Sequence, residues 1–155
     1  MNEIGIVVSF TKGVSMWPLI KQGRNYVAIK PLEGEPKNND ILLFEQIRKG
    51  ETTCILHRLI RKNGDVYVTR GDNCINCEYI RREDIIGKVT DIYKRGSEKH
   101  ISVTDNGSLF YVRFWNMIWP VRLCLYKTRN AVAKVLKKIL PKSAVSYLKK
   151  VRRAI

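Results

Sequence analysis

The chain has 155 residues and a mass of 18.0 kDa, which is the size of one compact domain with a hydrophobic core. Hydrophobic residues make up 45% of the sequence, and it contains only 10 Gly and 5 Pro, so collagen-like, low-complexity and wholly disordered classes are excluded. The 29 Lys and Arg against 14 Asp and Glu give a net charge of +15, and four cysteines are too few for a disulfide scaffold.

The positive charge is concentrated in the last third of the chain. Residues 1–108 contain 17 basic and 14 acidic residues, whereas residues 109–155 contain 12 basic residues and no acidic one. A tail of one sign on a nearly neutral body indicates an anionic partner, either a membrane surface or a nucleic acid. No uninterrupted apolar stretch reaches about eighteen residues, so no membrane-spanning helix is predicted.

Apolar runs rich in β-branched and aromatic residues predict strands in the first two thirds of the chain. They cover residues 26–32, 41–47, 54–62, 66–72 and 82–96. Asn63-Gly64 between two of these runs predicts a hairpin. We expect about five to seven strands before Gly107, which together form a small, coiled, mainly antiparallel β-structure.

Beyond residue 107 the apolar pattern changes to helical spacing. Residues 109–140 predict a helix that is broken or kinked at Pro120. Residues 143–155 have apolar side chains near one face and basic side chains away from it, so they predict a basic amphipathic helix. The sequence therefore predicts a β domain over residues 1–106 and a basic helical tail over residues 107–155.

Four motifs follow one another in the β domain. They are Gly13-Val14-Ser15-Met16-Trp17-Pro18, Asn39-Asp40-Ile41-Leu42-Leu43-Phe44, Leu56-His57-Arg58-Leu59-Ile60 and Gly71-Asp72-Asn73. In this order they resemble the nucleophile motif, the first conserved strand, the general-base strand and the Gly-Asp-Asn box of the signal peptidase I family and the related self-cleaving repressors. The resemblance covers residues 13 to about 95 and implies the family's coiled antiparallel β peptidase fold.

The residue at the base position separates the branches of that family. Bacterial signal peptidases and the repressors have a Lys there, whereas the endoplasmic-reticulum and archaeal enzymes have a His, as this chain does at His57. The resemblance implies a Ser15 nucleophile and a His57 general base, since an imidazole with an ordinary pKa near ~6.5 accepts a proton at neutral pH. Either Asp72 or Glu78 can orient the imidazole, and we favour Asp72.

The residues around the serine are candidates for substrate binding. Met16 and Trp17 resemble cleft positions beside the nucleophile, and plain core packing is their alternative role. The backbone N–H of Ser15, with Gly13 or Val14 as a second donor, is a candidate oxyanion hole. Clefts of this kind bind an extended peptide by strand addition.

Cys74 and Cys77 form a C-x-x-C pair, a spacing that can bind zinc or take part in redox exchange. A zinc site needs four ligands, and Cys54 and Cys124 have no matching spacing. We therefore expect no metal and no cofactor.

The expected function is that of a serine endopeptidase that cleaves a leader or signal-like segment from a precursor peptide or protein. The alternatives are a catalytically inactive peptide-binding or membrane-associated module on the same fold and a nucleic-acid-binding protein.

Family members usually have a membrane anchor before the serine, where this sequence has fourteen residues. We expect the basic, aromatic-rich tail over residues 109–155 to hold the protein peripherally at an anionic membrane, on the cytoplasmic side. Nucleic acid is the less favoured partner because the tail has no helix-turn-helix pattern.

Overall fold

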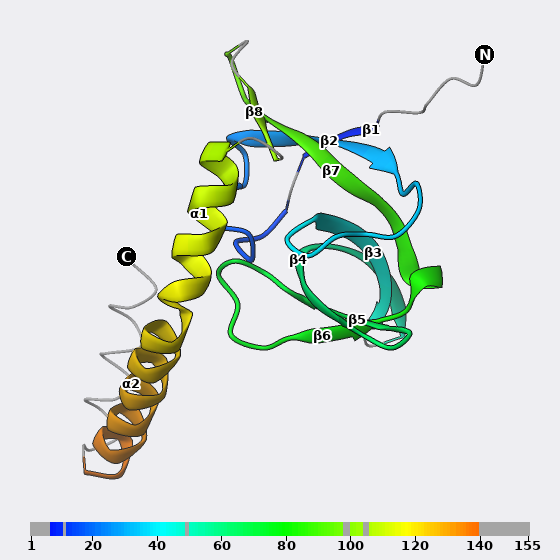
Figure 1. Ribbon diagram of the computed structural model, residues 1–155. Helices are drawn as coiled ribbons and strands as arrows, with labels where there is room; N and C mark the ends of the chain where they lie inside the picture. Colours follow the sequence, from blue (N-terminus) through cyan, green and yellow to red (C-terminus); the bar gives the residue numbers. More distant parts are fainter. Residues whose placement is uncertain (1–6, 11, 49, 98–99, 104–105, 140–155) are drawn as a thin grey trace, which may run out of the picture. The chain divides into compact units, whose positions relative to one another are not determined.

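The computed structural model describes residues 7–10, 12–48, 50–97, 100–103 and 106–139. These residues form an 8-stranded antiparallel sheet followed by two helices (Figure 1). The prediction of a mainly β fold with a helical C-terminal part is confirmed. The amphipathic helix expected over residues 143–155 lies outside the described residues.

Every strand pair of the sheet is antiparallel. The strand order is β1-β2-β7-β3-β4-β5-β6, and β8 pairs with β7. The strands are β1 (Val7–Phe10), β2 (Asn25–Pro31), β3 (Ile41–Arg48), β4 (Glu51–Asn63), β5 (Val66–Arg70), β6 (Glu78–Ile80), β7 (Ile85–Lys94) and β8 (His100–Ser102). Figure 1 shows β3, β4 and β5 curving around one another beside the long strand β7.

The eight described strands exceed the five to seven that we expected before Gly107: the five longer strands correspond to the predicted apolar runs, whereas β1, β6 and β8 were not predicted individually. These three contain only 4, 3 and 3 residues, which is too short to show an alternating pattern. The predicted hairpin is confirmed, because Asn63 pairs with Val66 and leaves Gly64 and Asp65 as its loop. Gly64 has a positive φ of 59°, a conformation that glycine adopts without steric cost.

Strand β3 has hydrophobic clusters on both of its faces. Ile41 and Leu43 contribute to one cluster, and Leu42 and Phe44 to the other. This alternation follows from the two-residue period of side chains along a strand. The first cluster also contains Met16 and Ile20, so it anchors the segment that carries Ser15 to the sheet.

Two helices follow the sheet, α1 (Asn106–Met117) and α2 (Trp119–Ile139). The predicted break near Pro120 is confirmed, since proline is tolerated in the first turn of a helix but not in its interior. The chain divides into two compact units, residues 1–115 and 116–155. Most of α1 therefore belongs with the sheet, beyond the boundary that we expected at residue 106, and its Val112 is buried.

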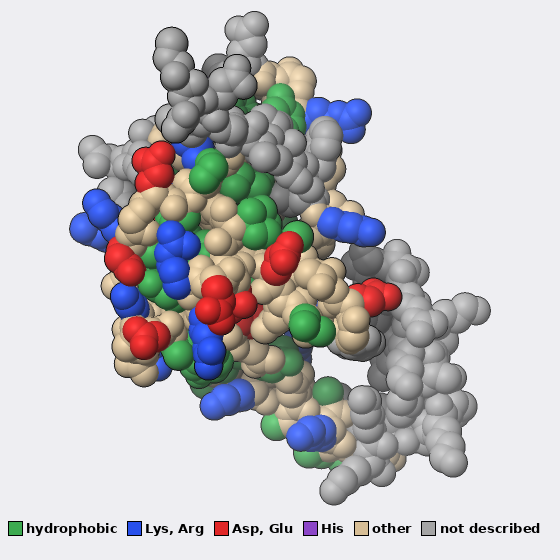
Figure 2. Space-filling view, turned by 90° about the vertical axis from the view of Figure 1, so that its right-hand side faces the viewer, with side chains coloured by type: hydrophobic (Ala, Val, Ile, Leu, Met, Phe, Trp, Pro, Cys, Tyr) green, Lys and Arg blue, Asp and Glu red, His purple; other side chains and the backbone are tan. Residues whose placement is uncertain are grey.

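On the face shown in Figure 2, acidic and basic side chains are interspersed. This mixture agrees with the nearly balanced charges of residues 1–108. Among the described helices, none has both the length and the apolar character needed to cross a bilayer.

Candidate active site

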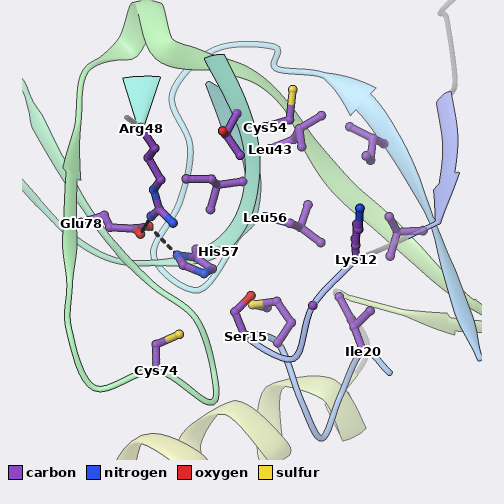
Figure 3. A pocket seen from close by; sticks show the side chains of 16 residues that line it. Lys12, Ser15, Ile20, Leu43, Arg48, Cys54, Leu56, His57, Cys74 and Glu78 are labelled. Carbon is purple, nitrogen blue, oxygen red and sulfur yellow. Dashed lines mark hydrogen bonds and ion pairs between the residues drawn. The ribbon is translucent and has the colours of Figure 1, made fainter. Parts of the chain in front are cut away.

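A cleft of about 420 Å³ opens on the β-structure. Ser15, His57, Cys74 and Glu78 all line it, although they come from three separate regions of the sequence. Figure 3 shows Ser15, His57 and Cys74 around one end of this cleft, with Glu78 on the far side of the imidazole. The structure therefore brings the predicted nucleophile and the predicted base to the same cavity.

Ser15 lies in a turn that the core holds in place. The N–H of Trp17 donates to the carbonyl of Val14 at 3.2 Å, and the N–H of Ile20 donates to the carbonyl of Met16 at 3.0 Å. Met16 is only 4% exposed, whereas Ser15 is half-buried. The turn thus presents the hydroxyl beside the cleft while the next side chain anchors the backbone.

His57 stands in the middle of β4 and is 5% exposed. Its Nδ1 lies 2.6 Å from Oε2 of Glu78, and its N–H donates a hydrogen bond to the carboxylate. The edge of the imidazole meets the ring of Phe44, with 6.2 Å between centroids. These contacts fix the orientation of the ring, and Glu78 favours the tautomer with hydrogen on Nδ1 when the imidazole is neutral.

Glu78 begins the short strand β6, where it pairs with Thr69 of β5. Its second carboxylate oxygen contacts the guanidinium of Arg48 at the end of β3. Burial alone raises the pKa of Glu78, but the hydrogen bond and charge of His57 and the charge of Arg48 lower it below the ordinary value. Glu78 is therefore an ionised partner for the imidazole.

The pKa of His57 differs from the ordinary value assumed from the sequence. Burial alone lowers it, yet hydrogen bonds to Cys74 and Glu78 and their charges outweigh burial and raise it to about 9. An imidazole with that pKa is only about 1% neutral at pH ~7. The resting site therefore contains a protonated His57.

The other imidazole nitrogen faces the backbone of the Gly-Asp-Asn box. A methyl group added at Gly71 would lie 2.8 Å from Nε2 of His57, 2.7 Å from the backbone carbonyl oxygen of Ser15 and 2.9 Å from Sγ of Cys74. Only glycine fits where these three groups converge. Nε2 thus lies near Gly71, which also adjoins the backbone carbonyl of Ser15, on the opposite side of the ring from Glu78.

The structure corrects the assignment of Asp72 as the orienting carboxylate. Asp72 accepts two hydrogen bonds from Arg58, each at 2.8 Å, in a buried bidentate ion pair. Successive side chains of a strand point to opposite faces, so the guanidinium of Arg58 and the imidazole of His57 leave β4 in different directions. The carboxylate at Nδ1 is Glu78, the alternative that the sequence left open.

The predicted substrate-binding residues have different surroundings. Gly13 and Met16 line the cleft, although Met16 is also a member of the core. Val14 and Trp17 are exposed and are not part of the cleft lining. The N–H of Gly13 donates to Oε1 of Gln22 at 2.7 Å, so this candidate oxyanion donor is engaged in the present conformation.

The four cysteines, Cys54, Cys74, Cys77 and Cys124, are free thiols. Within the described residues, no group of three or more His, Cys, Asp or Glu side chains is arranged to hold a metal ion. In the sequence Cys74 was considered only as part of a C-x-x-C pair. The structure places its thiol within hydrogen-bonding distance of the imidazole of His57.

Two contributions to the site were not predicted. Apart from its position at the end of a strand, nothing in the sequence indicated that Arg48 would contribute to the site. The ion pair of Arg58 did have one, because an arginine within the apolar run of β4 requires a buried counter-charge. The structure shows that this counter-charge is Asp72, while Glu78 is the partner of His57.

Comparison of the chain with protein families, curated proteins and solved structures found no match.

Proposed function

We propose that the protein is a serine endopeptidase of the signal-peptidase type, with Ser15 as nucleophile, His57 as base and Glu78 as the residue that orients His57. The observation that supports this most strongly is the two-sided placement of the imidazole. Nδ1 is held by Glu78 at 2.6 Å, while Nε2 faces the turn of Ser15 across the glycine of the Gly-Asp-Asn box. A nucleophile, a base and a group that orients the base are the three parts of such a mechanism.

In the proposed reaction the hydroxyl oxygen of Ser15 attacks the scissile carbonyl, and its proton passes to Nε2 of neutral His57. The tetrahedral intermediate collapses as the protonated imidazole gives that proton to the leaving amine. Water then hydrolyses the acyl-enzyme by the same route. Glu78 stabilises the imidazolium in both halves of the cycle, and the backbone N–H of Ser15 is the candidate oxyanion donor.

The substrate that fits this proposal is a precursor that offers an extended segment beside the cleft. The walls include Val27 and Ile29 of β2, Leu43 of β3 and Leu56 of β4. These apolar side chains suit an uncharged segment with small residues at alternate positions, such as a leader or signal-like sequence.

A fluorophosphonate probe and an internally quenched peptide with alanine at alternate positions test the assignment. We expect the parent protein to be labelled at Ser15 and to cleave the peptide. Ser15→Ala abolishes both reactions, and His57→Ala slows them about a thousandfold or more. Ser102→Ala on β8 is the matched control and retains both. Equal processing by the parent and the two site variants would show that the peptidase assignment is wrong.

A non-catalytic peptide-binding module on the same fold is the second candidate. The observation that favours it is the pKa of about 9 for His57, which leaves little neutral base at physiological pH. The pH dependence separates the two candidates. A peptidase gains activity as the pH rises through about 9, because the neutral imidazole is the reactive form, whereas a binding module shows no turnover at any pH.

For the tail we propose peripheral association with an anionic membrane surface. Residues 109–155 contain no acidic residue, and the described helices expose several large apolar side chains. These include Phe110, Phe114, Val121, Leu125 and Val132. Basic residues near an anionic surface contribute about 1 kcal/mol each, and exposed aromatic rings insert at the headgroup level.

Vesicle flotation with the full chain tests the membrane proposal. Anionic vesicles that contain phosphatidylserine are expected to bind the protein, and neutral phosphatidylcholine vesicles are not. Reversing Lys127, Arg129 and Lys134 to Glu should weaken binding about a hundredfold or more. Equal binding to both vesicle types would contradict the electrostatic part, and preferential binding to duplex DNA would favour the nucleic-acid alternative.

A further inference from the structure

One peptide group connects helix α1 to the segment of the candidate nucleophile. The backbone carbonyl of Asp72 accepts a hydrogen bond from the indole Nε1–H of Trp115 at 2.6 Å. The N–H of the same peptide group, which belongs to Asn73, donates to the backbone carbonyl of Ser15 at 2.7 Å. A peptide group is planar and rigid, so its carbonyl and its N–H move together. The bond from α1 to the carbonyl therefore also restrains the N–H that holds the Ser15 turn.

Further contacts keep the peptide group in place. The side-chain amide of Asn73 donates to the carbonyl of Val14 at 3.2 Å, which ties a second residue of the turn to the same loop. The carboxylate of Asp72 is fixed by Arg58, and the hydroxyl of Tyr111 lies 3.4 Å from one of its oxygens. The loop is thus attached to α1, to β4 and to the turn that carries Ser15.

The indole itself has a defined orientation. Tyr111 and Trp115 are one helical turn apart on α1, and their rings stack with centroids 5.8 Å apart and planes 18° from parallel. A stacked aromatic pair restricts the rotation of both rings. The donor is therefore directed at the carbonyl of Asp72 before any substrate binds.

The position of Ser15 relative to the imidazole depends on this loop. The adjoining residue, Gly71, separates the carbonyl of Ser15 from Nε2 of His57 with no room for a side chain. A small displacement of the loop thus changes the approach of the hydroxyl to the base, and reaction rates fall steeply with such displacements. A hydrogen bond to the carbonyl also strengthens donation by the N–H of the same peptide group.

We propose that Trp115 is a positioning residue for Ser15, acting through the peptide group between Asp72 and Asn73. The expected effect of Trp115 on reaction rate rests on the proposed peptidase function. The connection from Trp115 through the loop to the Ser15 turn rests only on the hydrogen bonds. The proposal makes α1 part of the active-site scaffold as well as the start of the basic tail.

Trp115→Phe tests the proposal in the full chain, because it removes the N–H and keeps an aromatic ring. Trp119→Phe is the matched control, since it makes the same substitution in the other compact unit. At saturating fluorophosphonate we expect Trp115→Phe to be labelled about five- to tenfold more slowly than the parent, with an unchanged half-saturating concentration. Backbone deuterium exchange should become faster at residues 13–17 and 71–74 and stay unchanged in β3 and β4.

Unchanged labelling together with unchanged exchange would overturn the proposal. Faster exchange that extends into β3 and β4 would overturn it as well, because the indole would then only stabilise the domain. If the parent is not labelled, the peptidase function fails and the exchange pattern alone decides whether Trp115 positions the loop.

Should Trp115→Phe fail to fold, Tyr111→Leu serves as the second variant. It removes the stacked ring and leaves the indole, so we expect the same two effects at smaller size, about twofold in the labelling rate. Parent-like labelling and exchange in Tyr111→Leu would then contradict the proposal.

Discussion

Replacing Glu78 with Gln tests how the imidazole of His57 is held. The substitution removes the negative charge 2.6 Å from Nδ1 and keeps the size of the side chain. The folded protein raises the pKa of His57 from 6.5 to about 9, which corresponds to about 3 kcal/mol of preference for the protonated ring. Glu78 is one of the two groups that cause the rise, so its removal should lower the pKa by about 1 unit or more.

The sign of the stability change follows from the same shift. A raised pKa means that the folded state binds the proton more tightly than the unfolded state does. The stabilisation is fully present below the unfolded pKa of 6.5 and is lost as the pH rises through about 9. The free energy of unfolding of the parent should therefore exceed that of Glu78→Gln by more at pH ~6 than at pH ~10.

Nuclear magnetic resonance titration of the imidazole measures the pKa directly, without any need for activity. A His100→Gln background leaves His57 as the only imidazole in the chain. Glu83→Gln is the matched control, because Glu83 is an exposed carboxylate outside the cleft. An unchanged pKa in Glu78→Gln, or an equal shift in the control, would refute the assignment of Glu78 as the partner of His57.

Three other substitutions separate structural from chemical roles. Asp72→Asn should lower the free energy of unfolding by about 3 to 5 kcal/mol, measured by denaturant titration, because it leaves the buried charge of Arg58 without its counter-ion. Gly71→Ala should abolish fluorophosphonate labelling, since the added methyl would meet the carbonyl oxygen of Ser15 at 2.7 Å. Cys74→Ala should lower the pKa of the imidazole, because the thiol helps to raise it. The midpoint of the pH–rate profile then moves below about 9, and activity at neutral pH increases.

Each of these variants has a control in the same chain. Asp65→Asn changes an exposed acid in the β4–β5 hairpin, and Cys124→Ala removes an exposed thiol that is not part of the cleft lining. Gly107→Ala adds a methyl group that meets nothing within 4 Å. We expect the controls to keep the parent's stability, labelling and pH–rate profile, and matching effects in variant and control would contradict the corresponding prediction.

Local patterns in the sequence were enough to predict most of the fold. The apolar runs located the five longer strands, Asn63-Gly64 located the hairpin, and Pro120 located the interruption between the helices. These features depend on side-chain periodicity and backbone preferences, which act over a few residues. The short strands β1, β6 and β8 escaped prediction because their pairing with longer neighbours, rather than their own sequences, makes them strands.

The candidate site was predictable only in part. The motif order predicted Ser15 and His57 as site residues, and both line one cleft. The choice between Asp72 and Glu78 depended on which carboxylate Arg58 engages and on the pairing of Glu78 with Thr69. Such contacts join residues that are distant in sequence, so periodicity contains no information about them.

Sequence alone determined which chemical groups the protein has: a hydroxyl in a tight turn, an imidazole on a strand and a tail without acidic residues. Tertiary structure decided their properties. The pKa of His57 follows from burial and from its hydrogen bonds to Glu78 and Cys74, and the role proposed for Trp115 follows from its hydrogen bond to the loop of Asp72. Electrostatic and hydrogen-bonding interactions depend on distances through space, and folding sets those distances.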